Sequence, residues 1–519
     1  MADAAVDLGH EGVQRTLATE ISDRLSQELV FALVGPVGSG VSACAKFLSE
    51  ILTQQFGYQV APIIKPSDII RAESHRVGVA NISREPMSRY IKEMQDAGNA
   101  LRDKFGPNYL AEKAVERIAK FRKDKDGYAA NGSMLPGRRA YIIDSIKNIE
   151  ELTLLRQIYR ETLCVFGVFA PDELRKKRLI DDGVNESEVK NVVDRDQGEV
   201  VTFGQMTRKI FVQSDFFICN DRKKDELGQR VNRYLEIIFN TNIHTPTRHE
   251  SAMYEASAAM AGSACMSRQV GAAIISATGE LISVGWNDVP KFRGGLYKED
   301  DQNIWDEEKK SIQDNDHRCF KWGTRICHNE VRRTKIADGI ARRFFNSGLA
   351  LPTAIESDVR KIIEGTEVDD LTEFSRSIHA EMESILAVAR EGKHSLVGAT
   401  MYTTTYPCHN CARHIVAAGI ASVIYIEPYR KSLAIALHND AISEDPDDRK
   451  RVVFRQYDGV SPVHYLQLFR AASERKSAGK FYQRAPVQAL PIFRVPLDGP
   501  VEYESKVIAD LGAKEDTQK

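Results

Sequence analysis

Four side chains in the second half of this chain must meet at one point, and that requirement constrains the fold more than any other feature. The sequence reads His379-Ala-Glu381 and, further along, Pro407-Cys408-His-Asn-Cys411. His379, Cys408 and Cys411 supply the three protein ligands of a catalytic zinc site, whose fourth tetrahedral position is left to water. Glu381 is spaced to lie beside the metal rather than on it, where a carboxylate can move protons.

The residues around this motif predict the elements that carry it. Apolar residues recur at helical spacing from Ser377 to Ala389, with Ser377 as the expected N-cap. A buried strand is predicted over 399–405 and a second helix over 412–418, which Gly419 ends. Both cysteines then lie at a helix N-terminus, where free amides favour the thiolate. A closed structural zinc site is the alternative, but it needs a fourth protein ligand and gives the neighbouring carboxylate no role.

Two further segments precede the motif in the sequence. Arg268-Gln-Val-Gly-Ala begins a predicted strand, and Gly285-Trp-Asn287-Asp-Val-Pro290 follows the next strand as a loop. Together with the histidine, glutamate and cysteines, these segments resemble deoxycytidylate deaminases, which are zinc-dependent nucleobase deaminases. The resemblance implies a cytidine-deaminase-like αβα sandwich, a hydrogen bond from Asn287 to the sugar hydroxyl of the substrate, and Arg268 near its phosphate. Tyr406, just before the cysteine motif, is placed to stack on the base.

Length and charge limit what the whole chain can be. At 519 residues it is too long for one hydrophobic core and predicts two or three domains. A formal net charge of −2 argues against a dedicated nucleic-acid binder, and the eight cysteines do not suggest a disulfide framework. The N-terminal residues lack the basic and apolar regions of a signal peptide, and no apolar run reaches membrane-spanning length. We therefore expect a cytoplasmic protein with no membrane partner.

A glycine-rich loop follows the first predicted strand, over residues 29–34. Its sequence is Gly35-Pro-Val-Gly38-Ser-Gly40-Val41-Ser42, and a helix is predicted directly after it. Strand, glycine-rich loop and helix form the context of a P-loop, whose backbone amides hold phosphates at a helix N-terminus. Val41 stands where the P-loop pattern requires lysine, so we expect nucleotide binding, with Mg²⁺ at Ser42, and little phosphoryl transfer. Lys46 lies one helical turn too far along to replace that lysine.

The rest of the first half predicts the sheet that carries this loop. Buried strands alternate with helices at 58–64, 139–145, 162–169 and 215–219. The alternation predicts a doubly wound parallel sheet, and this half resembles the P-loop folds of nucleoside and nucleotide kinases. Asp144 has a Walker-B-like place at a strand end. Gln95, Asn99 and Arg102 are expected to face a nucleotide, and Asp194-Arg195-Asp196 to belong to a lid. Solvated helix surfaces and ordinary loop chemistry are the alternatives for these segments.

The polar segment 241–249, which contains Pro246, is the expected domain junction. We predict an N-terminal extension at 1–27, a P-loop nucleotide-kinase-like domain at 28–240, a zinc-dependent deoxycytidylate deaminase domain at 241–490 with an insert at 291–376, and a C-terminal tail at 491–519 that is polar and disordered from Gly512. The predicted fold class is α/β throughout, a doubly wound parallel sheet followed by an αβα sandwich.

Taken together, the two halves resemble bacterial antiphage dCTP deaminases. The resemblance implies hydrolytic deamination of free deoxycytidine nucleotides, dCTP and also dCMP, to deoxyuridine nucleotides and ammonia, which deprives an invading phage of dCTP. It also implies Zn²⁺ as the cofactor, a homo-oligomer and, in some members, a small RNA that represses the enzyme.

Two other functions fit parts of the sequence. A deaminase that acts on cytosine in single-stranded DNA or RNA needs a basic groove with stacking aromatic side chains. The near-neutral charge and the P-loop neighbour favour a free nucleotide instead. A nucleotide-responsive switch is compatible with the main hypothesis, because a P-loop that binds nucleotide without hydrolysing it can control a second activity.

The insert at 291–376 contains a second group of residue types that bind metals. These are His317, Cys319, Cys327 and His328. Their spacing matches no common zinc finger. A second zinc site is therefore one hypothesis, and the other is a set of buried thiols and surface histidines that cluster without a metal.

Overall fold

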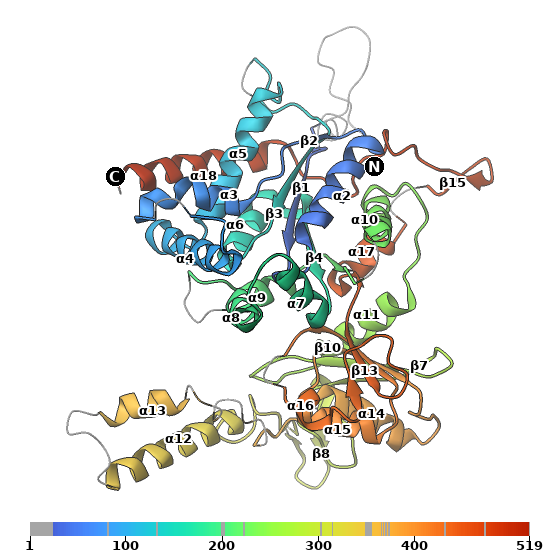
Figure 1. Ribbon diagram of the computed structural model, residues 1–519. Coiled ribbons are helices and arrows are strands. Elements are labelled where there is room, and N and C mark those ends of the chain that lie inside the picture. Colours follow the sequence, from blue (N-terminus) through green and yellow to red (C-terminus); the bar gives the residue numbers. More distant parts are fainter. Residues whose placement is uncertain are drawn as a thin grey trace. The chain divides into compact units, whose positions relative to one another are not determined.

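The computed structural model describes residues 24–517 apart from short gaps, and these residues form two compact units (Figure 1). The gaps are at 80–81, 131–132, 199–202, 222–223, 302–303, 314, 348–354, 365, 367, 369–370, 372–373, 430–431 and 472–473. Unit 1 comprises Met1–Pro246 and Asp458–Lys519, and unit 2 comprises Thr247–Tyr457. Most of the expected N-terminal extension lies outside the described residues. Among the described helices, none combines the length and apolar character needed to span a bilayer.

Unit 1 is built on a six-stranded sheet in the order β14-β5-β4-β1-β3-β2. Its strands are β1 (Leu29–Val34), β2 (Gln59–Val60), β3 (Arg139–Asp144), β4 (Leu163–Phe169), β5 (Phe216–Cys219) and β14 (Gly459–Val460). All of them are parallel except β14, which pairs antiparallel with β5 at the edge. Every residue of β1, β3 and β4 is buried, as expected of central parallel strands covered on both faces. The parallel-rich α/β sheet predicted for this half is confirmed.

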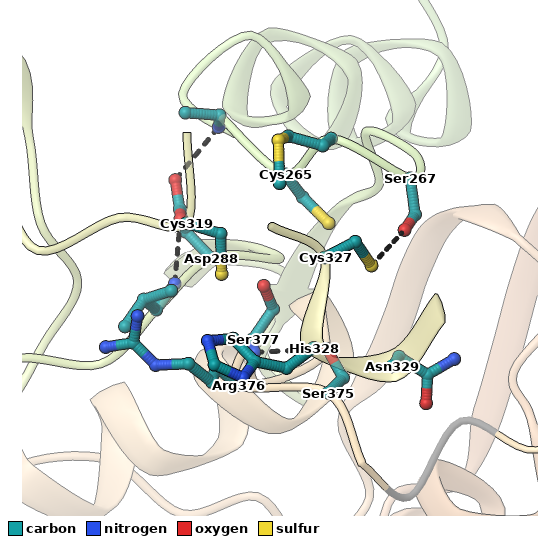
Figure 2. Close-up of a pocket in the computed structure, with 13 residues that line it drawn as sticks. Cys265, Ser267, Asp288, Cys319, Cys327, His328, Asn329, Ser375, Arg376 and Ser377 are labelled. Atoms are coloured by element: carbon teal, nitrogen blue, oxygen red, sulfur yellow. Dashed lines mark hydrogen bonds between the residues drawn. The ribbon is translucent and has the colours of Figure 1, made fainter. Parts of the chain in front are cut away.

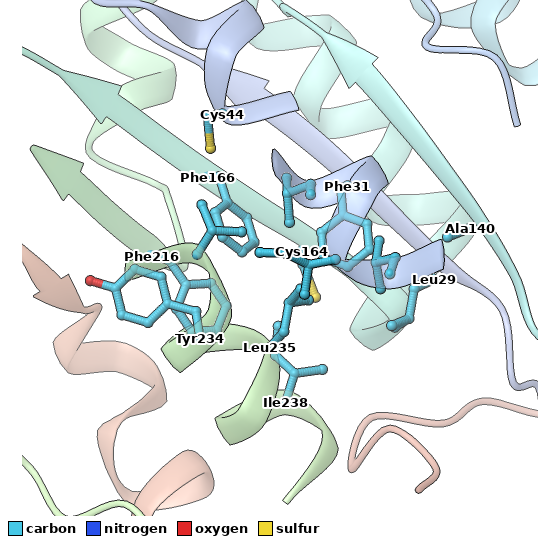
Figure 3. Close-up of a cluster of buried hydrophobic side chains, with 14 of the residues drawn as sticks. Leu29, Phe31, Cys44, Ala140, Cys164, Phe166, Phe216, Tyr234, Leu235 and Ile238 are labelled. Carbon is cyan, nitrogen blue, oxygen red and sulfur yellow. The ribbon is translucent and has the colours of Figure 1, made fainter. Parts of the chain in front are cut away.

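Helices cover both faces of this sheet and enclose two apolar cores. Phe31 of β1 belongs to the first core and its neighbour Ala32 to the second, since successive strand residues point to opposite faces. The first core packs against α2 (Val41–Gln54) and α10 (Lys224–Phe239). Figure 3 shows Phe166 stacked on Phe216 there, with ring centroids 4.9 Å apart and Tyr234 of α10 beside them. The second core packs against α3 (Pro66–Glu73), α4 (Met87–Phe105), α5 (Tyr109–Asp124) and α6 (Ile149–Tyr159).

Three shorter helices lie after the fourth strand in the chain. They are α7 (Asp172–Asp181), α8 (Glu186–Gln197) and α9 (Thr207–Phe211). α7 and α8 pack on each other through a small apolar cluster of their own, which includes Leu179 and Val189 and against which Val37 of the glycine-rich loop packs.

The C-terminal segment returns to unit 1, and this corrects the expected domain boundaries. β14 extends the sheet, α17 (Tyr465–Phe469) contacts α10, and α18 (Asp498–Thr517) packs along α5. Arg122 of α5 is buried and donates hydrogen bonds to Glu28 and Glu504, so it ties residues from near both ends of the chain together. Residues 458–490 therefore belong to unit 1 rather than to unit 2, and a helix continues through the segment expected to be disordered.

Unit 2 is built on a second six-stranded sheet, in the order β12-β13-β11-β10-β6-β7. Its strands are β6 (Gly271–Ile275), β7 (Leu281–Trp286), β10 (Thr400–Thr405), β11 (Ser422–Glu427), β12 (Ile442–Ser443) and β13 (Val452–Gln456). β6 and β7 form an antiparallel hairpin, β10 is antiparallel to β6, and β10, β11, β13 and β12 run parallel.

Two glycines show that helices lie on both faces of this second sheet. A Cβ atom at Gly271 would lie 1.9 Å from the carbonyl oxygen of Ala256 in α11 (Arg248–Met260). At Gly285 it would lie 2.5 Å from the carbonyl oxygen of Ala380 in α14 (Ala380–Glu391). Gly285 pairs with Ala272, the residue after Gly271, so the two glycines face opposite sides of the sheet. The helices approach closely only because neither position has a side chain, and the result is an αβα sandwich.

The remaining elements of unit 2 come from the insert and from the segment after the cysteine motif. They are β8 (Ile304–Asp306), β9 (Ser311–Gln313), α12 (His328–Asn346), α13 (Glu356–Glu364), α15 (His409–Ala417) and α16 (Ala434–His438). β8 and β9 form a short hairpin, and α12 packs against α13 (Figure 1). In unit 1, β15 (Lys476–Ser477) and β16 (Lys480–Phe481) form another small hairpin.

Candidate metal centre and its surroundings

The predicted zinc ligands lie at the N-termini of two helices in unit 2. His379 is the N-cap of α14, and Cys408 is the N-cap of α15, which carries Cys411 in its first turn. The helix begins later than predicted, because the amide of Ile378 donates a hydrogen bond to the carbonyl oxygen of Asp288 and holds that residue extended. Ser377 is therefore not the N-cap. The histidine itself takes the cap position, where its backbone is extended.

The three side chains converge closely enough to hold one metal ion. Their ligand atoms all lie within 4.8 Å of one another. Nδ1 of His379 is 3.4 Å from Sγ of Cys408 and 3.3 Å from Sγ of Cys411. One imidazole and two thiols are the donor set of a zinc site that keeps an open position, so the residues fit Zn²⁺. Among the described residues, no other group of three or more histidine, cysteine, aspartate or glutamate side chains has its ligand atoms this close together.

The electrostatics of this cluster favour a charged thiol. The hydrogen bond that Cys408 accepts from Cys411, with further help from His379, lowers the pKa of Cys408 to about 4. The hydrogen bond to Cys408 is also the main reason that the pKa of His379 is raised to about 9. Metal binding requires neutral imidazole and two thiolates, so an incoming zinc ion displaces protons from His379 and Cys411.

Glu381 lies beside the ligands in the first turn of α14. It is only 4% exposed, and its Oε2 lies 3.6 Å from Sγ of Cys411. Burial raises the pKa of Glu381 above its ordinary value. A carboxyl group with a raised pKa can both accept and return a proton near neutral pH, which is the property of a general acid–base.

The residues expected to contact the sugar and phosphate are held by the protein itself. Asn287 donates from Nδ2 to the carbonyl oxygen of Arg268, 2.8 Å away, and its Oδ1 accepts from the amide of Val270 over 2.7 Å. Arg268 donates to the carboxylate of Glu427 at the end of β11. Through its two hydrogen bonds, to Arg268 and Val270, Asn287 holds the segment just before β6 in place. No pattern in the sequence points to Glu427, because it ends β11 and lies far along the chain from Arg268.

Tyr406 has a different place from the one expected for a base-stacking residue. Its ring is 7% exposed and packs edge-on against Tyr425 and Phe454, with centroids 4.8 and 5.4 Å away. Its hydroxyl lies beside Glu444, and burial foremost raises the pKa of Tyr406. The ring belongs to the apolar core of unit 2, so this arrangement lends no support to its stacking on a base.

Three thiols from distant parts of unit 2 line one pocket. They are Cys265, Cys319 and Cys327, and Figure 2 shows them with His328 and Arg376. Sγ of Cys327 lies 3.4 Å from the hydroxyl of Ser267. Burial raises the pKa of Cys319, and the neighbouring thiols Cys265 and Cys327 raise it further. The sequence hypothesis of a second zinc thus missed Cys265, which lies far upstream of the insert.

The two histidines of the second-zinc hypothesis, His317 and His328, lie in different surroundings. His328 lines the thiol pocket at the start of α12. His317 instead contacts Tyr297, whose hydroxyl is 3.3 Å from its Nδ1, and Trp322, whose ring centroid is 6.1 Å away. His317 is not among the residues that line the pocket.

The glycine-rich loop of unit 1 connects β1 to α2, as predicted. Gly38 and Gly40 have φ angles of 80° and 84°, in the left-handed region that favours glycine. Val41 begins α2, and the hydroxyl of Ser42 donates to Oδ2 of Asp144 over 2.7 Å. Gly35 has no room for a side chain, because a Cβ there would lie 2.2 Å from the carbonyl oxygen of Val168.

The polar residues predicted to face a nucleotide lie on α4 and are buried. Gln95 and Asn99 are each 8% exposed. Arg102 is 3% exposed and donates to Glu151 over 2.8 Å. Arg102 therefore serves a buried ion pair between α4 and α6 in this arrangement.

Comparison with known proteins agrees with the geometry of unit 2. Residues 246–427 match the family described as the cytidine and deoxycytidylate deaminase zinc-binding region, and this match includes the three ligands and Glu381. The deoxycytidylate deaminase of Enterobacteria phage T4 is 49% identical over 55 residues, which is 11% of this chain and 28% of the phage protein. ComE operon protein 2 of Bacillus subtilis (strain 168) is 45% identical over 56 residues, 11% of this chain and 29% of that protein. The chain thus matches less than a third of the length of these relatives.

Solved structures with partial likeness include two that align with about two fifths of the chain. The dCMP deaminase of cyanophage S-TIM5 in complex with dCMP and dUMP is 18% identical, with a TM-score of 0.22, and the alignment covers 41% of this chain and 98% of that one. TT1252 from Thermus thermophilus is 16% identical, with a TM-score of 0.25, covering 40% and 96% respectively.

Proposed function

We propose that unit 2 catalyses the hydrolytic deamination of deoxycytidine nucleotides to deoxyuridine nucleotides and ammonia. The observation that carries this proposal is the buried carboxylate of Glu381 beside a converged His379, Cys408 and Cys411 set. These three side chains would hold Zn²⁺, which when bound supplies the Lewis acidity that makes water a nucleophile at neutral pH. In the net reaction a C4–O bond forms at the cytosine ring and the C4–N bond to the exocyclic amine breaks.

Glu381 is the residue to which we assign the proton transfers. Its raised pKa lets it take a proton from the attacking water and return protons to the ring nitrogen and the leaving amine. The cytidine and deoxycytidylate deaminase match over residues 246–427 supports this chemistry, and the phage relatives named deoxycytidylate deaminase support a deoxycytidine nucleotide as substrate.

We further propose dCTP as a substrate beside dCMP, with removal of dCTP during phage infection as the biological role. What supports this is the resemblance of the two halves of the sequence, a glycine-rich loop without its lysine followed by the deaminase motifs, to antiphage dCTP deaminases. A cytoplasmic homo-oligomer, and in some members a repressing small RNA, belong to the same proposal.

A deamination assay on the purified chain tests the proposed activity. dCTP, dCMP, CTP and a cytosine-containing single-stranded DNA are offered separately, and uracil products are separated by chromatography. We expect conversion of dCTP or dCMP and none of the DNA. Conversion of the DNA alone would contradict the proposal and assign the enzyme to nucleic-acid editing.

We also propose that the thiol pocket holds a second, structural zinc ion. Its ligands would be Cys265, Cys319 and Cys327, with His328 as the fourth, because all four line the same pocket. Four protein ligands leave no open position, as is typical of structural zinc. Among the described residues, only the active-site set has all its ligand atoms within 4.8 Å of one another. The pocket thiols would therefore move closer together on binding.

Metal analysis tests the second site without any activity measurement. The intact protein should contain about two zinc ions per chain, and Cys319→Ser should lose one of them while keeping deaminase zinc. Cys219→Ser, which changes a half-buried thiol of unit 1, should keep both. One zinc ion per chain in the intact protein and in Cys319→Ser alike would refute the second site.

A further inference from the structure

The structure brings a lysine to the glycine-rich loop that the P-loop pattern in the sequence does not predict. The side-chain nitrogen of Lys147 donates to the carbonyl oxygen of Gly35 over 2.9 Å and to Oδ1 of Asp196 over 2.7 Å. Lys147 follows β3, which is the parallel neighbour of β1, so the chain after β3 emerges beside the loop that follows β1. The loop therefore has a cation close to it, although Val41 stands at the usual lysine position.

The backbone of Lys147 is fixed as well. Its amide donates to Oε2 of Glu151 over 2.8 Å, and its carbonyl oxygen accepts from the amide of Met206 over 2.7 Å. The side chain of Lys147 therefore extends from a backbone held by two hydrogen bonds, and it is 22% exposed. Lys46, the nearer lysine in the sequence, is 75% exposed and pairs with Glu50 on the surface of α2.

The carboxylate of Asp196 binds to the glycine-rich loop as a phosphate group would. Its Oδ2 accepts a hydrogen bond from the amide of Val37 over 2.8 Å, while Oδ1 accepts from Lys147. The side chain is 4% exposed. A backbone N–H of a glycine-rich loop and a lysine ammonium are the two kinds of donor with which P-loops hold phosphate oxygens. The carboxylate of Asp196 therefore has the surroundings of a bound phosphate.

The rest of the loop has further features of a polyphosphate site. Ser42 and Asp144 are hydrogen-bonded over 2.7 Å, and a hydroxyl and a carboxylate in these positions hold Mg²⁺ in phosphate-binding folds. The hydroxyl of Ser39 is buried inside the loop and has no hydrogen-bond partner among the described residues. It lies against Gly35, since a Cβ there would be 2.6 Å from it. A buried polar atom without a partner is costly, and a ligand group that reaches it removes that cost.

We propose that residues 35–42 and Lys147 form a binding site for the polyphosphate of a Mg²⁺–nucleoside triphosphate, and that Asp196 holds the place of a phosphate group until the nucleotide displaces it. Lys147 then has the role that Val41 cannot fill. Displacement of Asp196 separates the end of α8 from the loop, and α8 packs on α7.

α7 is attached to the same loop through its arginines. Arg175 donates to the carbonyl oxygen of Val37 over 3.0 Å, and Arg178 donates to that of Gly38 over 3.2 Å. These contacts use the carbonyl side of the loop and leave the amide of Val37 to Asp196. The α7–α8 pair is therefore the part of unit 1 that responds to nucleotide in this proposal.

The competing explanation is that Lys147 and Asp196 form a purely structural ion pair. The two explanations predict different changes in nucleotide affinity for Asp196→Asn. If Asp196 competes with phosphate, Asp196→Asn removes the competing charge and strengthens nucleotide binding. If the pair only stabilises the loop, the same substitution weakens binding or leaves it unchanged.

The test is calorimetric titration of the full-length protein with MgATP, which lacks cytosine and so is not a substrate of the proposed deaminase. Lys147→Ala should weaken binding by about tenfold to a hundredfold, the range for loss of a charge-assisted hydrogen bond. Lys147→Arg should retain most of the affinity, and Lys46→Ala should bind like the unchanged protein. Asp196→Asn should bind more tightly. Competition by inorganic tripolyphosphate would show that the phosphates, rather than the base, are recognised.

Several results would overturn the proposal. One is equal affinity in Lys147→Ala and Lys46→Ala, and another is an affinity in Asp196→Asn that is equal to or lower than that of the unchanged protein. Absence of MgATP binding at millimolar concentration in both the unchanged protein and Asp196→Asn would also refute it. Thermal unfolding of each variant separates loss of binding from loss of folding. None of these measurements uses deamination. Failure of this nucleotide-site proposal can therefore be distinguished from failure of the proposed deaminase activity.

Discussion

Replacing Glu381 with glutamine is expected to lower the deamination rate by about a hundredfold to ten-thousandfold, the usual contribution of general acid–base catalysis. Glutamine has the shape of glutamate but cannot accept or return a proton, so the substitution removes the chemistry and keeps the packing. The side chain is 4% exposed, and solvent therefore cannot easily take over its role. Zinc content should stay unchanged, because Glu381 is not among the converged ligand atoms.

Glu383 offers a matched control for this experiment. It lies on the same helix, is 6% exposed, and pairs with Arg390 rather than with the ligand cluster. Glu383→Gln neutralises an equally buried carboxylate and should leave the deamination rate within a few-fold of the unchanged protein. Retention of nearly full activity in Glu381→Gln, or a parallel loss of zinc, would show that Glu381 has another role.

The sequence was most informative where function depends on spacing within one helix turn. His379 and Glu381 both lie at the start of α14, and Cys408 and Cys411 both lie at the start of α15, so a local pattern is enough to predict that each pair lies close together. The start of α14 was misplaced by a long-range contact. Asp288 lies far upstream, and its hydrogen bond to Ile378 is invisible to any local helix pattern.

Residues supplied by neighbouring strands could not be found in the same way. Lys147 reaches the glycine-rich loop because β1 and β3 are adjacent in the sheet. Cys265, which precedes β6, lines the same pocket as Cys319 of the insert. Predicting these contacts requires the strand order and the register, which the alternation of strands and helices does not specify.

The domain boundary was misjudged for a related reason. β14 has two residues, and such a short strand gives no periodicity to recognise. α18 buries Glu504 and Leu511 on a largely polar helix, so its composition resembled that of a disordered tail. The buried ion pairs of Arg122 hold this helix in place, and a pair of opposite charges far apart in sequence carries no pattern of its own.

Replacing Cys411 with serine should remove the active-site zinc and abolish measurable deamination. Cys411 is 1% exposed, and its Sγ lies 3.3 Å from Nδ1 of His379 at the point where the ligands converge. A serine hydroxyl stays protonated at neutral pH and is a poor zinc ligand, so the site retains two donors where a catalytic site needs three. Metal analysis should show one zinc ion fewer per chain than in the unchanged protein.

The same substitution should also lower the melting temperature of unit 2, since a ligand that binds only the folded state stabilises it by mass action. A metal held by His379, Cys408 and Cys411 would join the start of α14 to the start of α15, and these two helix ends would lose that common anchor without it. A chelator applied to the unchanged protein should reproduce both effects, and Cys219→Ser, in unit 1, should reproduce neither. If Cys411→Ser kept its zinc and its activity, the converged side chains would not be the catalytic metal site, and the assignment of deaminase chemistry to unit 2 would fail with them.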